Sequence, residues 1–354
     1  MDKQPERDSE RAPDERSAQD VDAKGDILST TLIADIPNTK DDFVGTYLLK
    51  SKTLAESKGG AHYLKLRLSD KSGEIDAFVW QDIEVADSSV ATGQVIKLRG
   101  RVNIYQQKTN VRVLKLRPAS ENEYDVRTIV ECPKTDPEEL LAVVKKMIEG
   151  VSDPHYRALL GAVFSDEEFV SRFKIAPGAK SIHHAYRGGL LEHTVSLLRL
   201  ATSICEMFGD LDRNLLITSC ILHDIGKMQE YNEELAIERT TKGRLLGHIV
   251  LGLLSLQRYV ARVGEFPPAK WETLLHVLIS HHGSLEWGSP QVPMTLEAIA
   301  LHYIDNLDAK LSQFRTASKR HKDPNFEGFT TYDKFLERYV YFGNRSTEAD
   351  AVEG

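Results

Sequence analysis

The hydrophobic pattern of this 354-residue chain changes its period partway along, and this change constrains the fold more than any other feature. Between residues 27 and 118, five short segments alternate apolar and polar residues, which is the period of a half-buried strand. Five strands within about 90 residues fit a small closed barrel better than an immunoglobulin sandwich, which needs seven or more. From residue 136 onward, apolar residues recur at helical spacing. The sequence therefore predicts a multi-domain α and β protein, with a five-stranded β barrel followed by an all-α helical bundle.

Charge and composition divide the chain further. Residues 1–26 contain nine acidic and five basic side chains and almost no large apolar ones, which predicts a disordered charged tail. The barrel segment, residues 27–118, contains 14 basic and 10 acidic side chains, although the whole chain has a net charge of −8. We expect a linker at residues 119–135, the helical domain at 136–318 and a C-terminal extension at 319–354. A basic module in an acidic chain suggests that a polyanion, if one binds, meets the barrel first.

The composition argues against membrane and secreted proteins. No run of 18 or more apolar residues is present, so we expect neither a transmembrane helix nor a membrane partner. The first 20 residues are polar and charged where a signal peptide would be apolar. Cys132, Cys205 and Cys220 form no CxxC pair, which argues against a disulfide framework and against a thiolate zinc site. We therefore expect a cytoplasmic protein.

Histidines are concentrated in the helical half of the chain, where nine of the 12 lie between His183 and His302. His223 and Asp224 follow an apolar run, and an imidazole beside a carboxylate is costly there unless the two are paired or bind a metal. Neutral imidazole and carboxylate oxygen are ligands of first-row transition metals, and one carboxylate can bridge two ions. A single histidine on an apolar helix face is usually a hydrogen-bonded core residue. Several on different helices are what a metal site in a bundle core requires.

The order of these residues resembles the HD-domain superfamily of metal-dependent phosphohydrolases, whose minimal pattern is H…HD…D. The additional histidines around positions 248 and 281 are similar to the version of the superfamily that holds two metals. The resemblance implies a metal site formed by His193, His223, Asp224, His248, His281, His282 and Asp305. It also implies that Asp224 and Lys227 are catalytic, because Lys227 matches a lysine that lies over the substrate phosphate in many HD hydrolases. The alternative for Lys227 is a helix-terminal lysine that faces the helix dipole.

Residues around the first predicted ligand are candidates for substrate binding. They are His183, His184 and Arg187, together with Lys227. The alternative is that the two histidines only cap the following helix. Glu192 is adjacent to His193 and is interpreted as a surface residue. Asp308 shares a helix face with Asp305, and the alternative to a metal-binding role is that it pairs with Lys310.

Longer segments carry a closer resemblance. IHHAYRGGLLEHT, HDIGK, ISHHG and IALHYIDNLDAK are similar to segments of YhaM-type 3′–5′ exoribonucleases, over about residues 28–316. Those proteins have an OB-fold before the HD domain, which is the order that the periodicity predicts here. The resemblance implies that a metal-activated water hydrolyses phosphodiester bonds of single-stranded RNA, with single-stranded DNA as a second candidate. It implies one or two divalent ions and favours Mn²⁺ over iron, cobalt or zinc.

The sequence is also compatible with two other functions. One alternative is an HD-type phosphohydrolase of small nucleotides, which would turn over mononucleotides without needing the barrel. Another is a nucleic-acid-binding protein with an inactive HD site, which would bind no metal. The sequence also leaves open whether the chain forms a homo-oligomer.

The predicted barrel has a composition that suits single-stranded nucleic acid. Bases stack on aromatic rings while cations follow the phosphates, and OB barrels present such surfaces. The candidate contacts are Tyr63, Lys65, Arg67, Trp80, Arg99, Arg101 and Tyr105. Because alternation places half of the strand residues inside, Trp80 and Phe78 share one face that could instead be core.

Overall fold

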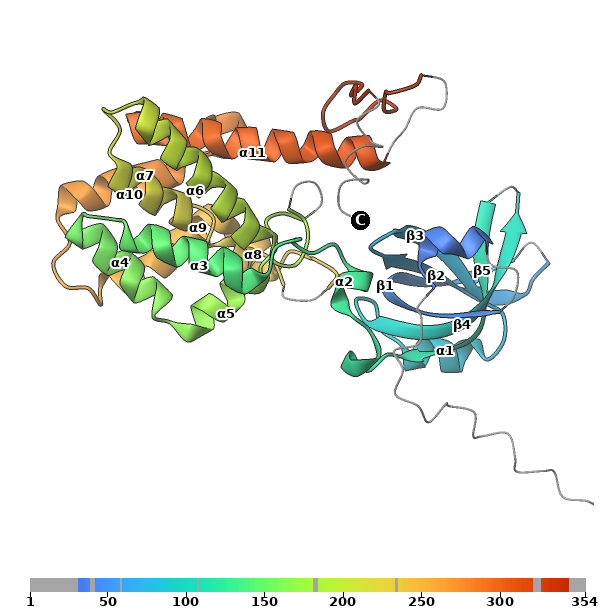
Figure 1. Ribbon diagram of the computed structural model, residues 1–354. Coiled ribbons are helices and arrows are strands. Elements are labelled where there is room, and N and C mark those ends of the chain that lie inside the picture. Colours follow the sequence, from blue (N-terminus) through green and yellow to red (C-terminus); the bar gives the residue numbers. More distant parts are fainter. Residues whose placement is uncertain are drawn as a thin grey trace, which may run out of the picture.

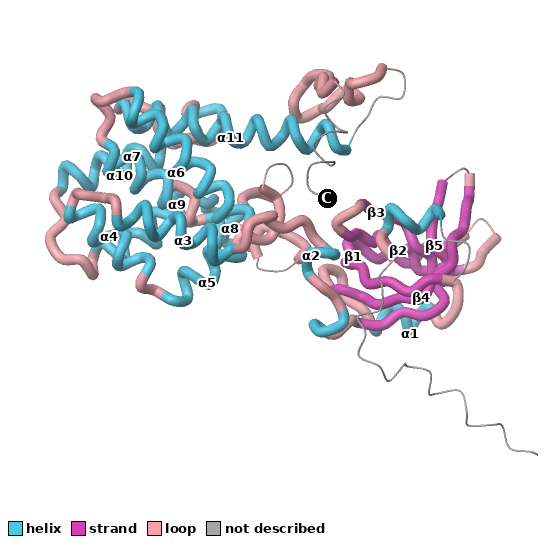
Figure 2. Tube along the Cα trace, in the orientation of Figure 1, coloured by secondary structure: helices cyan, strands magenta, loops and turns pink. Residues whose placement is uncertain are grey.

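The computed structural model consists of a β barrel and a helical region that lie side by side and are joined by a short helical connection (Figure 1). It describes residues 31–38, 42–57, 59–106, 108–180, 184–232, 235–320 and 326–343. The predicted tail at residues 1–26 lies outside the described residues. The arrangement confirms the predicted fold class, and Figure 2 shows the strands gathered in one part and the long helices in the other.

The barrel closes in the strand order β1-β2-β3-β5-β4. Only β3 and β5 pair in parallel, and the other neighbours are antiparallel. A closed five-stranded barrel of this kind is an OB-fold. The strands are β1 (Phe43–Glu56), β2 (His62–Asp70), β3 (Gly73–Val79), β4 (Val95–Tyr105) and β5 (Lys108–Pro118).

Alternation along the strands determines which side chains fill the barrel. In β2, Leu64, Leu66 and Leu68 are fully buried, and the residues between them face outward. Two short elements accompany the barrel, η1 (Ile33–Asn38) before β1 and α1 (Ile83–Ser89) between β3 and β4. Neither element is predicted from the hydrophobic pattern, because each is too short to show a clear period.

The connection between barrel and helices is partly helical, with η2 (Glu121–Glu123) and α2 (Val126–Ile129) inside the predicted linker. Ile129 packs with Leu48 and Val95 of the barrel in a small buried cluster. Leu235, which follows α8 (Lys227–Glu230) of the helical region, packs against the same cluster. The barrel and the helical region therefore share an apolar contact.

The helical region begins at an aspartate cap. Asp136, Asp153 and Asp212 each accept backbone N–H groups at the start of a helix, which satisfies donors that the first turn leaves free. The helices are α3 (Pro137–Glu149), α4 (Pro154–Phe164), α5 (Glu167–Ile175), α6 (Gly189–Met207), α7 (Arg213–Leu222), α8 (Lys227–Glu230), α9 (Thr241–Val260), α10 (Pro268–Ser280), η3 (Leu285–Trp287) and α11 (Leu296–Arg320).

Part of the predicted C-terminal extension is described, at residues 326–343. This segment packs on the end of α11 through a small cluster of Ala317, Leu336 and Val340. Isolated bridges such as Phe329 to Tyr341 hold it together. Among the described helices, none combines the length and the apolar character that a membrane span needs.

Candidate metal centre and nucleic-acid surface

The centre is built around the turn between α7 and α8. α7 is buried along most of its length and ends at His223, so His223 and Asp224 enter the interior directly after an apolar helix. The turn packs closely on α9, because a Cβ at Gly226 would lie 1.9 Å from the backbone oxygen of His248. Glycine at this position therefore permits the close approach of His248 to Asp224.

Four other elements bring side chains to the same point. His193 comes from α6, Asp305 comes from α11, and His281 is the residue that caps α10. His248 follows Gly247, whose φ of 69° and ψ of 162° interrupt α9. A φ in this range favours glycine, so the interruption that precedes His248 depends on that residue.

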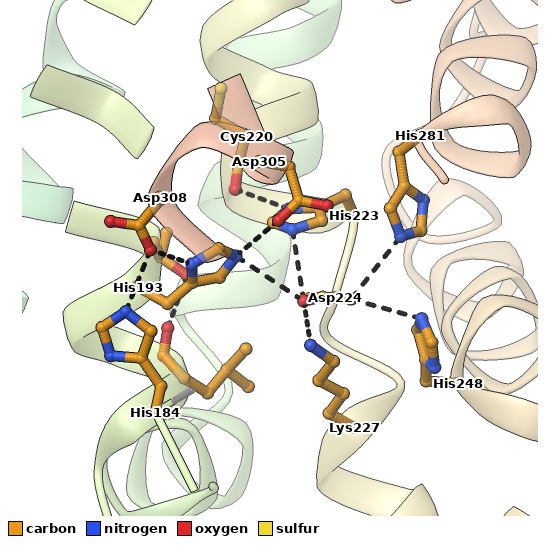
Figure 3. Close-up of polar contacts among 12 residues, drawn as sticks. His184, His193, Cys220, His223, Asp224, Lys227, His248, His281, Asp305 and Asp308 are labelled. Atoms are coloured by element: carbon orange, nitrogen blue, oxygen red, sulfur yellow. Dashed lines mark hydrogen bonds and ion pairs between the residues drawn. The ribbon is translucent and has the colours of Figure 1, made fainter. Parts of the chain in front are cut away.

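Asp224 lies at the middle of the cluster (Figure 3). Its Oδ2 atom is 3.2 Å from Nε2 of His223 and 3.8 Å from Nε2 of His193. Its Oδ1 atom is 3.4 Å from Nε2 of His248 and 3.7 Å from Nε2 of His281. The two oxygens of one carboxylate therefore face two different sets of imidazoles.

The inner atoms of this cluster are buried without hydrogen-bond partners. The orphaned atoms are Nε2 of His193, His223, His248 and His281, and Oδ1 of Asp224. Backbone carbonyls fix the tautomer of two of the rings, because Nδ1 of His223 donates to Cys220 and Nδ1 of His281 donates to Leu278. Nε2 of each of these rings then presents a lone pair inward. Buried lone pairs that converge without a donor fit a bound cation.

The donors form two sets, and within each set the ligand atoms lie within 4.8 Å of one another. The first is His193, His223 and Asp305, and the second is His248, His281 and His282. A further set, His184, His193 and Asp308, is equally close, but its facing atoms are hydrogen-bonded to one another. Nitrogen and carboxylate donors without thiolate suit manganese, iron, cobalt or zinc. All seven metal ligands predicted from the sequence are thus brought together.

Carboxylates hold the outer nitrogens of two rings. Oδ2 of Asp308 is 2.8 Å from Nδ1 of His193, and Oε2 of Glu230 is 2.9 Å from Nδ1 of His248. Such partners orient a metal-binding imidazole and raise its basicity. The interpretation of Asp308 as a partner of Lys310 was wrong, and Glu230 was not considered at all. The spacing of Asp308 from Asp305 was the available signal, whereas nothing in the sequence around Glu230 indicated its partner.

A buried network lies behind His193, on the side away from Asp224. His184 is 8% exposed, and its Nε2 is 2.9 Å from Oδ2 of Asp308. Its other nitrogen is 3.0 Å from the hydroxyl of Tyr186, which donates to Glu192. Glu192 is therefore half-buried and hydrogen-bonded, and the interpretation of it as a surface residue was wrong. Of the other predicted substrate contacts, Arg187 is half-buried before α6 and His183 lies outside the described residues.

The charges of the centre compensate for its burial. Burial alone would raise the pKa of Asp224, but the charge of Lys227, together with the neighbouring rings of His223 and His248, outweighs burial and holds this pKa well below its ordinary value. Burial alone would lower the pKa of His193, but the carboxylates of Asp305 and Asp308 beside its two nitrogens raise it to about 9. In contrast, burial lowers the pKa of His281 well below its ordinary value. His281 is therefore neutral, the form in which an imidazole binds a metal.

Lys227 points to the same carboxylate. Its Nζ is 2.5 Å from Oδ2 of Asp224, and its side chain is 11% exposed. Burial alone would lower its pKa, but the charges of Asp224 and Asp305 raise it, so the lysine stays protonated. A fixed positive charge therefore lies beside the predicted metal ligands.

The outer face of β2 and β3 carries Tyr63 and Phe78, and Trp80 follows directly after β3. Tyr63 stacks on Trp80 at a centroid distance of 4.8 Å, and Trp80 is 42% exposed. Phe78 lies beside Tyr63 and under the ammonium group of Lys65. An open groove of about 460 Å³ continues from Phe78 past Arg67 to Tyr105 at the β4–β5 hairpin. Trp80 and Phe78 therefore face outward, which decides between the two alternatives left open by the sequence.

The barrel's cations are partly neutralised by acidic partners. Arg67 pairs with Glu74 and Asp76, each at 3.0 Å. Arg99 and Arg101 lie on β4, where both pair with Asp42. These two arginines do not line the groove.

Comparisons with known proteins identify relatives of the helical region and of the whole chain. The family described as HD domain matches residues 190–310. The curated relatives include "3'-5' exoribonuclease YhaM" of Bacillus velezensis, 33% identical over 301 residues, which cover 85% of this chain and 92% of the relative. The protein of the same name from Bacillus subtilis is 33% identical over 300 residues, 84% of this chain and 92% of the relative.

Among solved structures, the barrel is similar to the second OB-fold domain of replication protein A from Methanococcus maripaludis. That likeness covers 23% of this chain and 86% of that domain, with 19% identity and a TM-score of 0.19. Fold and site together define an HD-domain protein with an OB-fold barrel before its helical region. The relatives narrow this class, and the chain belongs to the YhaM family of 3′–5′ exoribonucleases.

Proposed function

We propose that this chain is a metal-dependent 3′–5′ exoribonuclease that hydrolyses phosphodiester bonds of single-stranded RNA. The observation that carries the proposal is the convergence of buried, partnerless imidazole nitrogens on Asp224. Relatives named as 3′–5′ exoribonucleases align with 85% of the chain, including both the barrel and the helical region.

The residues of the centre have separate roles in this proposal. His193, His223 and Asp305 would hold one ion, and His248 with His281 or His282 would hold a second. Asp224 would contact both, since each of its oxygens faces one set. Divalent ions in such a site lower the pKa of water and polarise phosphoryl oxygens. Imidazole and carboxylate donors suit manganese, iron, cobalt or zinc, and among these we favour Mn²⁺ because of the resemblance to YhaM-type exoribonucleases.

Lys227 contributes charge and not coordination. Its ammonium group is protonated and fixed by Asp224, so it can offset negative charge on the phosphate oxygens as the transition state develops. Preorganised charge in a water-poor site is effective because little reorganisation is needed during the reaction.

The barrel would hold the RNA strand upstream of the cleaved bond. The stacked pair of Tyr63 and Trp80, the neighbouring groove and the exposed Tyr105 form a surface on which bases can stack. Single-stranded DNA can use the same stacking, so we propose it as a second ligand. A cytoplasmic location fits an RNA substrate and the three free cysteines.

The test is degradation of a 5′-labelled single-stranded RNA with added Mn²⁺, by the wild-type chain and by Asp224→Ala. We expect a ladder that shortens from the 3′ end with the wild type and intact RNA with the variant. RNA binding by the variant, measured by fluorescence anisotropy, should remain, because the barrel is unchanged. Wild-type degradation rates in the variant would refute the site, and intact RNA with the metal-loaded wild type would refute the activity.

A further inference from the structure

The outer face of α11 carries a row of exposed apolar side chains that the metal centre does not use. These six residues, here called the α11 stripe, are Leu296, Ile299, Tyr303, Leu307, Leu311 and Phe314. Their exposed fractions range from 36% for Phe314 to 64% for Tyr303. Contiguous exposed apolar surface of this kind marks an interaction site in a soluble protein.

We propose that a second copy of this chain covers the α11 stripe, with the two α11 helices packed antiparallel about a two-fold axis. The intervals between successive stripe residues are three, four, four, four and three, and this series is the same from either end. Its midpoint is position 305. An isologous interface needs such self-complementarity, because residue i must meet residue j while j meets i.

The symmetric spacing gives a defined register. When the two helices run antiparallel, Leu296 lies opposite Phe314 of the second copy, and Ile299 lies opposite Leu311. Tyr303 lies opposite Leu307 next to the axis. Each stripe residue therefore meets an apolar partner, and no charged side chain is required to lie between the helices.

The area of the stripe is close to what a dimer needs. The six side chains expose on the order of 500 Å² per copy, so that a pair would bury about 1,000 Å², near the lower bound of specific interfaces. Antiparallel packing adds to this area at both ends. Met294, which precedes α11 and is 67% exposed, would lie toward the exposed aromatic residues that follow α11 in the second copy, such as Phe326 and Phe335. Figure 1 shows α11 extending beyond the neighbouring helices toward this C-terminal segment.

The chemistry of the stripe favours a protein over RNA. Four of its six side chains are aliphatic and cannot stack on bases. Arg315 and Lys310 flank the C-terminal half, but no cation lies within the stripe itself. The metal ligand Asp305 lies on the opposite side of the helix, so the two centres of a dimer would face away from the helix pair.

The first test is the oligomeric state of the full chain by sedimentation velocity over a range of concentrations. We expect a dimer for the wild type and a monomer for Leu307→Glu, which places a charge next to the axis. The matched control is Leu254→Glu on α9, where the leucine has a similar exposed fraction of 49%, and it should remain dimeric. A monomeric wild type, a dimeric Leu307→Glu or a monomeric Leu254→Glu would each overturn the proposal.

The second test checks the register and does not depend on a disruptive variant. In a background of Cys132→Ser and Cys205→Ser, chains with Ile299→Cys are mixed with chains with Leu311→Cys under mild oxidation. We expect disulfide-linked dimers in the mixture and none from either variant alone, because like positions lie about 18 Å apart along the helix axis. Cross-linking of each variant with itself would indicate parallel helices and refute the register. A mixture that does not cross-link would refute the antiparallel pair.

Discussion

Replacing Asp308 by alanine should weaken metal binding although Asp308 is not itself a predicted ligand. One oxygen of Asp308 is 2.8 Å from Nδ1 of His193 and 2.9 Å from Nε2 of His184. Without it, the ring of His193 loses the partner that orients Nε2 toward Asp305, and both rings lose a buried acceptor. Loss of such a partner typically lowers metal affinity or activity about 10–100-fold. This corresponds to about 1.4–2.8 kcal/mol of binding free energy.

The assay is Mn²⁺ binding in competition with a chromophoric chelator, combined with RNA degradation at limiting and at saturating Mn²⁺. Asp308→Ala should bind Mn²⁺ more weakly and recover much of its activity when the ion is saturating. Asp308→Asn, which keeps an acceptor oxygen, should be intermediate. The matched control is Glu297→Ala, since Glu297 is a buried carboxylate of the same helix that accepts from the backbone N–H of Asp212. Unchanged affinity in Asp308→Ala, or an equal loss in Glu297→Ala, would refute the positioning role.

Three further predictions concern the centre and the barrel. Lys227→Ala should lower turnover about 10²–10³-fold with unchanged metal content, measured by elemental analysis, and loss of the metal would show that the lysine is structural. Removal of the metal by a chelator should lower the melting temperature in a calorimetric scan. Mn²⁺ at 100 times its Kd should then raise the free energy of unfolding by about 2.7 kcal/mol, and Asp224→Ala should not show this increase. Trp80→Ala in the Asp224→Ala background should weaken RNA binding by about 1–3 kcal/mol in anisotropy titrations. Ile104→Ala, an exposed residue without a ring, should not, and equal losses would contradict base stacking on Trp80.

The barrel was predictable because its pattern is local. Apolar and polar residues alternate along each strand. Leu64, Leu66 and Leu68 therefore identify the buried face of β2 without any information about the neighbouring strands. The same alternation could not show whether Trp80 faces inward, because both faces of β3 carry apolar residues near its end. Phe78 and Trp80 lie on one face, and Ala77 and Val79 lie on the other. The pairing of β2 with β3 decides it, since Ala77 and Val79 fill the interior.

The sequence could indicate the residues of the candidate metal centre, but not the carboxylates that position them. His223 and Asp224 are adjacent, so the HD pair of the HD-domain superfamily can be recognised directly in the sequence. Glu230 and His248 are 18 positions apart on different helices, and only the packing of α8 on α9 brings them to 2.9 Å. Carboxylates that orient metal ligands therefore cannot be predicted from the sequence unless they share a helix face with a ligand, as Asp308 does with Asp305.

α11 shows how one helix can serve two purposes whose tests are independent. Asp305 and Asp308 are three positions apart and reach His193 on the inner side. Tyr303 and Leu307 are two positions before and after Asp305, which the helical period of 3.6 places on the outer side. Substitutions on one side therefore leave the residues of the other in place. Leu307→Glu should change the oligomeric state with wild-type Mn²⁺ affinity, whereas Asp308→Ala should change Mn²⁺ affinity and leave the dimer intact.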